Sequence, residues 1–163
     1  FVKVCLDTVE TTATVMFIVA AASIFGWMLT ATGVTAEVAK AVLDFTREPW
    51  ICLLLANLLM LFVGCFLEPT AAITILVPLL LPIARQLGVD PVHFGLVMVL
   101  NLMIGLLHPP MGMVLFVLAR VARLSIERTT MAILPWLVPL LISLIVLTYV
   151  PRIALWLPRT LGM

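Results

Sequence analysis

A single carboxylate lies in the middle of a long apolar stretch. Glu68 begins the Glu-Pro-Thr sequence, and between Trp50 and Ala84 no other residue is charged. A carboxylate in such surroundings is costly to bury and typically marks an ion or substrate pathway. Glu68 is therefore a candidate proton or cation ligand, while a purely structural role as the cap of the following helix fits the sequence equally well.

Two consecutive prolines, Pro109 and Pro110, interrupt a second apolar run. Proline has no N–H and clashes with the carbonyl four residues earlier, so this pair is predicted to free the carbonyls of Gly105 and Leu106. In lipid such carbonyls need a partner, and a bound cation is one. A kinked helix repaired by its neighbours is the alternative. The glycines on both sides and His108 favour a broken helix that lines a cavity.

Oxygen ligands gathered at these two interruptions would suit a hard cation such as Na⁺. Pro69 also leaves the Cys65 carbonyl without a helical donor. Asn101 lies one turn before the second interruption, where hydrogen bonding between helices is an equally good interpretation. The predicted cation ligands are Cys65, Glu68, Thr70, Asn101, Gly105 and Leu106.

A new half-helix is expected after each interruption, and the N–H groups at a helix N-terminus attract anions. Thr70 is predicted to cap the first of these half-helices. The imidazole of His108 would allow pH to tune the site. The predicted anion-binding residues are Thr70, Ala71, Ala72, His108, Pro109, Pro110, Met111 and Gly112.

The composition indicates the class of protein. Hydrophobic residues make up 64% of the 163 residues, charged residues only 10%, and the mean hydropathy is +1.31. Together with long unbroken apolar runs, this predicts an all-α polytopic membrane protein in a lipid bilayer. A net charge of +1 gives no reason to expect nucleic-acid binding. The sequence contains neither an HExxH motif nor a plausible Ser-His pair, so no enzyme is predicted. The three cysteines lack paired spacing, so no redox or transition-metal role is predicted for them.

The apolar runs predict a single transmembrane domain over residues 1–163. Residues 11–32 carry no charge and form a first span, ended by Gly33. Thr35 is predicted to cap an interfacial amphipathic arm over residues 35–48, whose charged stripe lies opposite Val38 and Val42.

Residues 49–85 are predicted to fold into a hairpin. As one helix they would be about 50 Å long, against a hydrocarbon core of roughly 30 Å, so the chain must turn at Glu68-Pro69. Each arm then holds about 15 to 17 apolar residues, or roughly 23 to 26 Å of helix. This length favours a re-entrant hairpin with its tip inside the membrane over two complete crossings.

A broken span over residues 91–119 begins at Pro91 with Asp90 as its cap, and His93 is expected to be structural. A final span covers residues 129–150. The arginines between these two spans place their loop in the cytoplasm, which puts the mouth of the hairpin on the outer side.

Residues 64–117, GCFLEPTAAITILVPLLLPIARQLGVDPVHFGLVMVLNLMIGLLHPPMGMVLFV, are similar to the C-terminal part of the large membrane subunit of tripartite ATP-independent periplasmic (TRAP) transporters. The resemblance implies an elevator-type, Na⁺-coupled importer of organic anions, either dicarboxylates or sugar acids, in the bacterial inner membrane. It also implies a small membrane subunit and a periplasmic solute-binding protein as partners, and no cofactor besides Na⁺.

The resemblance further implies that the chain is one of two inverted halves of a longer subunit. An ion channel, or another kind of secondary anion transporter, remains the alternative, because broken helices also line pores. Saturable uptake that requires a Na⁺ gradient distinguishes a transporter from a channel.

Overall fold

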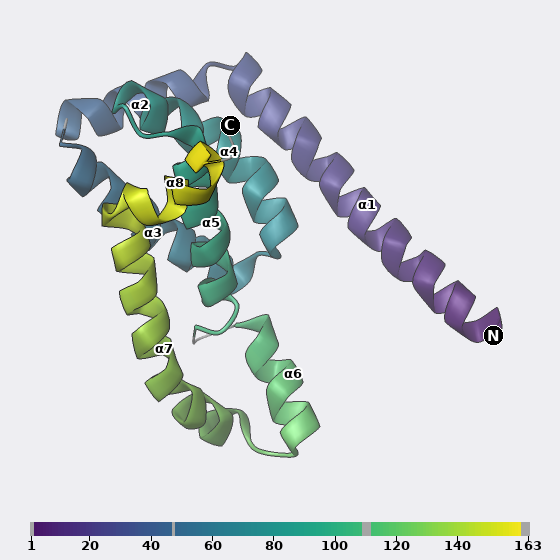
Figure 1. Ribbon diagram of the computed structural model, residues 1–163. Helices are drawn as coiled ribbons and strands as arrows, with labels where there is room; N and C mark the ends of the chain where they lie inside the picture. The colour runs from purple at the N-terminus through teal and green to yellow at the C-terminus, as the bar shows by residue number, and fades with distance from the viewer. Residues whose placement is uncertain (1, 47, 109–111, 161–163) are drawn as a thin grey trace.

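The computed structural model describes residues 2–46, 48–108 and 112–160, and within these ranges the protein consists of α-helices and short connections (Figure 1). The predicted all-α fold is confirmed. The helices are α1 (Val2–Ala31), α2 (Val34–Phe45), α3 (Pro49–Phe66), α4 (Pro69–Gln86), α5 (Pro91–Gly105), α6 (Met113–Ala122), α7 (Ile126–Tyr149) and α8 (Pro151–Thr160). Helices α1, α3, α4 and α7 are long and apolar enough to cross a membrane, and α5 is a shorter apolar helix.

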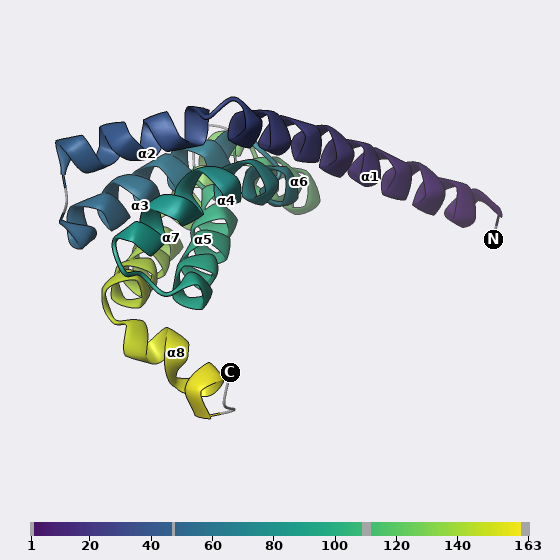
Figure 2. The same cartoon turned by 90° about the horizontal axis from the view of Figure 1, so that it is seen from above.

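The hairpin of α3 and α4 lies at the centre of the helix packing. Helix α3 packs mainly against α5, whereas α4 packs along α1 and also touches α5, and α7 packs on α5. Seen from above, α1 and α2 follow one side, the hairpin and α5 lie in the middle, and α8 lies on the opposite side (Figure 2). The N-terminal half of α1 extends away from the other helices, and the side chains of residues 2–10 are exposed.

The chain turns between α3 and α4 where Glu68-Pro69 predicts it, with Leu67 and Glu68 in extended backbone conformations. Both arms are 18 residues long, which corresponds to about 27 Å at 1.5 Å per residue. They are slightly longer than predicted because α4 continues through Pro78 and Pro82 to Gln86. By length and composition, each arm therefore qualifies as a candidate span.

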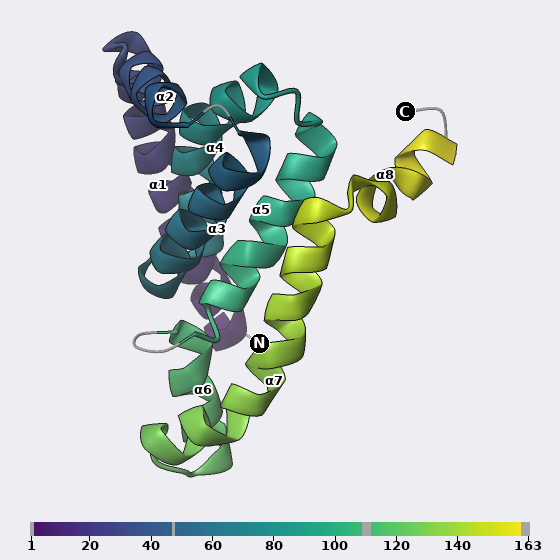
Figure 3. The same ribbon diagram turned by 90° about the vertical axis from the view of Figure 1, so that its left-hand side faces the viewer.

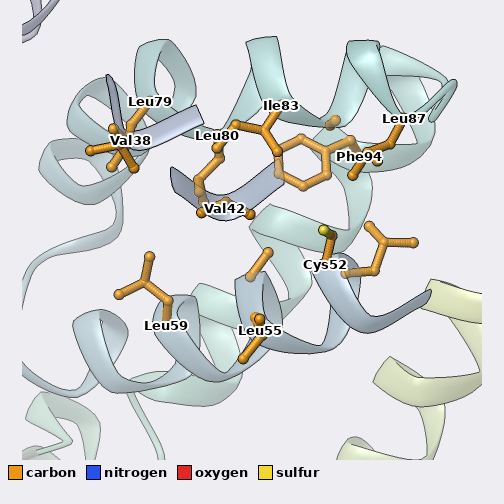
Figure 4. A pocket seen from close by; sticks show the side chains of 13 residues that line it. Val38, Val42, Cys52, Leu55, Leu59, Leu79, Leu80, Ile83, Leu87 and Phe94 are labelled. Carbon is orange, nitrogen blue, oxygen red and sulfur yellow. The ribbon is translucent and has the colours of Figure 1, made fainter. Parts of the chain in front are cut away.

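The start of α2 differs from the prediction. Thr35 lies inside the helix and does not cap it, because Gly33, with φ of 76°, redirects the chain and the helix begins at Val34. A left-handed φ favours glycine at this position. Val38 and Val42 face the hairpin, and they line an apolar pocket with side chains of α3, α4 and α5 (Figure 4).

The starts of α5 and α7 are set by polar caps. Asp90 accepts hydrogen bonds from the N–H groups of Val92 (2.8 Å) and His93 (3.3 Å), so the predicted start of α5 at Pro91 is confirmed. Helix α7 begins at Ile126, three residues before the predicted start, because the Ser125 hydroxyl accepts a hydrogen bond from the N–H of Arg128.

Helices α3 and α5 approach closely at a pair of glycines. A Cβ on Gly105 would lie 2.8 Å from the Cα of Gly64, and a Cβ on Gly64 would lie 3.2 Å from the carbonyl oxygen of Leu102. Small residues at such a crossing allow two backbones to touch. The crossing fixes how far along α5 the tip of the hairpin reaches.

We predict that Gly105→Ala destabilises the protein by about 1 to 3 kcal/mol, because the methyl group meets backbone atoms that cannot move aside locally. Gly95→Ala on the same helix is the matched control, since its Cβ would have no neighbour within 4 Å. We expect this control to be neutral or slightly stabilising. Thermal unfolding of the purified subunit in detergent measures both effects, and equal midpoints for the two variants would contradict the close crossing.

Candidate functional site

The tip of the hairpin is closed by its own carboxylate. Glu68 is the N-cap of α4, and its Oε2 accepts a hydrogen bond from the N–H of Ala71 at 3.1 Å. The Thr70 hydroxyl donates to the other carboxylate oxygen at 2.7 Å. The prediction that Thr70 caps this helix is wrong. Because Pro69 occupies the first helical position, the residue before it becomes the cap.

The cap occupies part of the predicted anion site. The N–H of Ala71 donates to the Glu68 side chain, and the N–H of Ala72 donates to the Glu68 carbonyl at 2.9 Å. An anion approaching this helix start would therefore compete with Glu68 for the Ala71 donor. The two carboxylate oxygens of Glu68 that cap the helix are the same oxygens that would bind a cation. Binding a cation would therefore free the donors that the cap now occupies.

The second interruption repairs most of its own hydrogen bonding. The N–H of His108 donates to the Gly105 carbonyl at 3.1 Å, and the N–H of Val114 reaches back across the break to the Leu106 carbonyl at 3.3 Å. The prediction that these carbonyls are orphaned is therefore wrong. The Gly105 carbonyl is satisfied by a donor just before the prolines, and the Leu106 carbonyl by a donor beyond them. Pro109, Pro110 and Met111, which the sequence places in the anion site, lie outside the described residues.

Gly112 makes this return possible. It is the N-cap of α6, and its N–H donates to the carbonyl of His108 at 3.2 Å. A Cβ at Gly112 would collide with the carbonyl oxygen of Leu106. A side chain there would prevent the return loop from closing on α5.

The structure brings the two interruptions together. The Cys65 Sγ lies 3.7 Å from the Nδ1 of His108, next to the crossing of Gly64 and Gly105. The hairpin tip lies at the level where α5 ends, while α6 and α7 continue beyond it (Figure 3). Elements more than 40 positions apart in sequence thus form one region within the helix packing.

Asn101 belongs to a different group. It is fully buried, and its Nδ2 donates to the carbonyl oxygen and to the Oδ1 of Asn57, at 3.0 and 2.9 Å. Asn57 lies eight residues before Cys65 on α3, which is about 12 Å along the helix. The six predicted cation ligands therefore fall into a group at the tip and break, and a separate asparagine between the helices.

Two residues of this buried network were not predicted from the sequence, Asn57 and Thr148. The Asn57 Nδ2 donates to the Thr148 hydroxyl oxygen at 2.9 Å, and that hydroxyl donates to the Leu144 carbonyl at 2.7 Å. Asn57 carries the only side-chain amide in α3, which is the signal that sequence reasoning missed. Its partner on α7 carries no comparable signal.

The direction of this network fixes the orientation of Asn101. The Thr148 hydroxyl donates its only proton to the Leu144 carbonyl, so its oxygen must accept the hydrogen bond from the Nδ2 of Asn57. The Asn57 oxygens then face Asn101 and hold its Nδ2. The Oδ1 of Asn101 points the other way, and among the residues that the structure describes it has no hydrogen-bond partner. It is a buried acceptor that is open to a donor or a cation.

His93 has the structural role predicted for it. Its side chain is buried, and its Nε2 lies 2.8 Å from the carbonyl oxygen of Leu147, which ties α5 to α7.

We predict that Asn57→Leu destabilises the protein by about 1 to 3 kcal/mol, because it removes the side-chain acceptor of the buried Asn101 amide and leaves it only the backbone carbonyl of residue 57. The double variant Asn57→Leu/Asn101→Leu should cost less than the sum of the two single variants, because no unpaired amide remains. Unfolding midpoints in detergent of all four proteins complete the cycle. Additive costs would show that the network is not a unit.

These features define a polytopic α-helical membrane protein in which two helix interruptions adjoin. Residues 1–153 match the family model of the tripartite ATP-independent periplasmic transporter, DctM component. The chain therefore belongs to this family, and the resemblance seen in residues 64–117 is confirmed.

Relatives cover almost all of the chain. It is 44% identical over 161 residues to the C4-dicarboxylate TRAP transporter large permease protein DctM of Pseudomonas aeruginosa, which covers 99% of the chain. It is 43% identical to the sialic acid TRAP transporter large permease protein SiaM of Vibrio cholerae, and 42% identical to the isethionate TRAP transporter permease protein DctMQ of Oleidesulfovibrio alaskensis, which cover 98% and 96% of the chain. These relatives are named as permeases. The chain spans 38%, 37% and 25% of their respective lengths.

Proposed function

We propose that the complete protein is the membrane subunit of a Na⁺-coupled secondary transporter that imports organic anions across the bacterial inner membrane. Its partners would be a small membrane subunit and a periplasmic solute-binding protein that delivers the anion. Family membership supports this proposal, as do the names of the relatives, which refer to C4-dicarboxylates, sialic acid and isethionate. These three are organic acids that are anionic at neutral pH.

The observation that carries the proposal is the meeting of the hairpin tip with the break after α5. Two adjoining interruptions bring backbone oxygens and helix N-termini to the same depth, where a cation and an anion can bind together. Here the contact between Cys65 and His108 joins them. We propose that the hairpin is re-entrant and that it moves with the site as part of an elevator-type half.

The proposed cation ligands follow from which oxygens are available. The Cys65 carbonyl receives no helical hydrogen bond from Pro69, which has no N–H. Glu68 and Thr70 lie beside it at the tip. The carbonyls of Gly105 and Leu106 already accept hydrogen bonds from backbone N–H groups, and they would have to give these up to bind the ion. Asn101 is the remaining candidate, because its Oδ1 has no hydrogen-bond partner within the described ranges, but it belongs to the separate network with Asn57.

The proposed anion site uses the start of α4 and the start of α6. When Na⁺ draws the Glu68 carboxylate away from Ala71, the N–H groups of Thr70 and Ala71 become available to the anion, with Ala72 completing that turn. On the other side, the anion would meet the imidazole of His108 and the start of α6 at Gly112. The proposed site also includes Pro109, Pro110 and Met111, which the sequence places between these two. Cation binding would in this way prepare anion binding, which is the basis of coupling.

Replacing Glu68 by Gln tests the cation site. The amide keeps a carbonyl oxygen for the N–H of Ala71 but removes the charge that holds Na⁺. We expect the Na⁺ concentration for half-maximal uptake to rise about tenfold, which corresponds to about 1.4 kcal/mol, while maximal uptake changes less. Uptake of radiolabelled dicarboxylate into proteoliposomes containing the complete transporter, measured over a Na⁺ series, gives both quantities.

Asp90→Asn is the matched control for this experiment. It neutralises another N-cap carboxylate, at the mouth of the hairpin, and so makes the same change of charge at a capping residue far from the tip while keeping the capping oxygen. Its Na⁺ dependence should equal that of the unmodified transporter. If Glu68→Gln also kept the unmodified dependence, Glu68 would be a helix cap and nothing more.

Thiol labelling tests the re-entrant hairpin. A single cysteine at position 70, in a transporter without other cysteines, should react slowly with bulky impermeant reagents added from either side of the membrane, because the tip lies at membrane depth. A cysteine at Leu124, in the exposed loop before α7, is the control and should react quickly from the cytoplasm. Fast labelling of position 70 from the cytoplasm would mean that α3 and α4 cross the membrane completely.

A further inference from the structure

Cys65 and His108 form a pair of soft ligands that no sequence motif brings together. Cys65 lies one residue before the end of α3, and only 4% of its surface is exposed. His108 follows α5 and is half-buried. Their ligand atoms, Sγ and Nδ1, lie 3.7 Å apart.

This separation suits a shared metal ion. Zinc binds a cysteine sulfur at about 2.3 Å and a histidine nitrogen at about 2.0 to 2.1 Å, usually with tetrahedral geometry. Two such bonds at a tetrahedral angle place sulfur and nitrogen about 3.6 Å apart. The side chains would hardly need to move. The thiol is already oriented by the Leu61 carbonyl, to which its Sγ donates at 3.2 Å.

We propose that the side chains of Cys65 and His108 bind Zn²⁺ or another soft divalent cation, beside the proposed Na⁺ site, which would use the backbone carbonyl of Cys65. On binding, the Cys65 thiol releases its proton to solvent and the thiolate bonds to the ion, while Nδ1 of the neutral imidazole donates its lone pair. No group of three His, Cys, Asp or Glu residues comes together within the described ranges, so water completes the coordination. A site with two protein ligands is expected to hold the ion more weakly than a structural zinc site with four.

The ion would join the tip of the hairpin to the break after α5. Cys65 belongs to the first arm and His108 to the broken span, so a metal bond between them clamps the two interruptions in the arrangement seen here. We infer that Zn²⁺ inhibits transport by holding this arrangement. The inhibition rests on the proposed function, but the binding does not.

Calorimetric titration of the complete purified subunit, without a polyhistidine tag, tests the binding with Zn²⁺ as the probe. Cys65→Ser and His108→Gln should each weaken one binding event by about tenfold or more, because each removes one of the two protein ligands. Mg²⁺ in excess should not compete, since it prefers oxygen ligands. Unchanged Zn²⁺ affinity in either variant would overturn the proposal.

Cys52→Ser is the matched control. Cys52 is also buried on α3, but its Sγ lies 3.6 Å from the Thr46 carbonyl oxygen, which is not a soft ligand. Its removal should leave Zn²⁺ binding unchanged. Equal loss in Cys52→Ser and Cys65→Ser would point to general disturbance of α3 and overturn the site. Matching unfolding midpoints of the variants confirm that each protein is folded.

The clamp is tested by uptake. Zn²⁺ should inhibit Na⁺-dependent uptake in proteoliposomes, a chelator should reverse the inhibition, and Cys65→Ser should need about tenfold more Zn²⁺ for the same effect. Binding without inhibition would overturn the clamp. An absence of Na⁺-dependent uptake would contradict the proposed function while the calorimetric result stands, so the two failures can be told apart.

Discussion

Backbone polar groups in apolar surroundings must find hydrogen-bond partners, and both interruptions of this protein are built to meet that requirement. At the tip, Glu68 accepts from the start of α4. At the break, Val114 reaches back to Leu106, and Gly112 leaves room for the chain to do so. Each interruption is therefore stable within the helix packing, and a ligand proposed to bind there would have to replace these hydrogen bonds. Exchange of this kind lets binding change conformation.

The glycine crossing sets the depth at which these two features meet. Because Gly64 and Gly105 let α3 and α5 touch, the tip of the hairpin reaches the end of α5. The Cys65 and His108 contact is a direct result. One steric feature thus decides the composition of the candidate site, although neither glycine has a side chain to contribute to it.

The network of Asn101, Asn57 and Thr148 complements this crossing. Its hydrogen bonds run in one direction across α5, α3 and α7, and they fix the register of the three helices. A buried amide network is well suited to specifying one arrangement over others, even where its net stabilisation is modest. In lipid, where packing alone discriminates weakly between registers, such hydrogen bonds are a strong constraint.

The sequence by itself determined the local features of this protein. Proline geometry placed the turn at Pro69 and the start of α5 at Pro91, and apolar length and motif spacing determined the class and family. Only the tertiary structure decided which residue caps α4, which donor satisfies Leu106, and which side chains meet at the site. Each of these depends on a partner selected by packing. Asn57 and Thr148 are 91 positions apart, and Cys65 and His108 are 43 apart. Helical periodicity assigns residues to a face, but the steric fit of the helices decides what that face contacts.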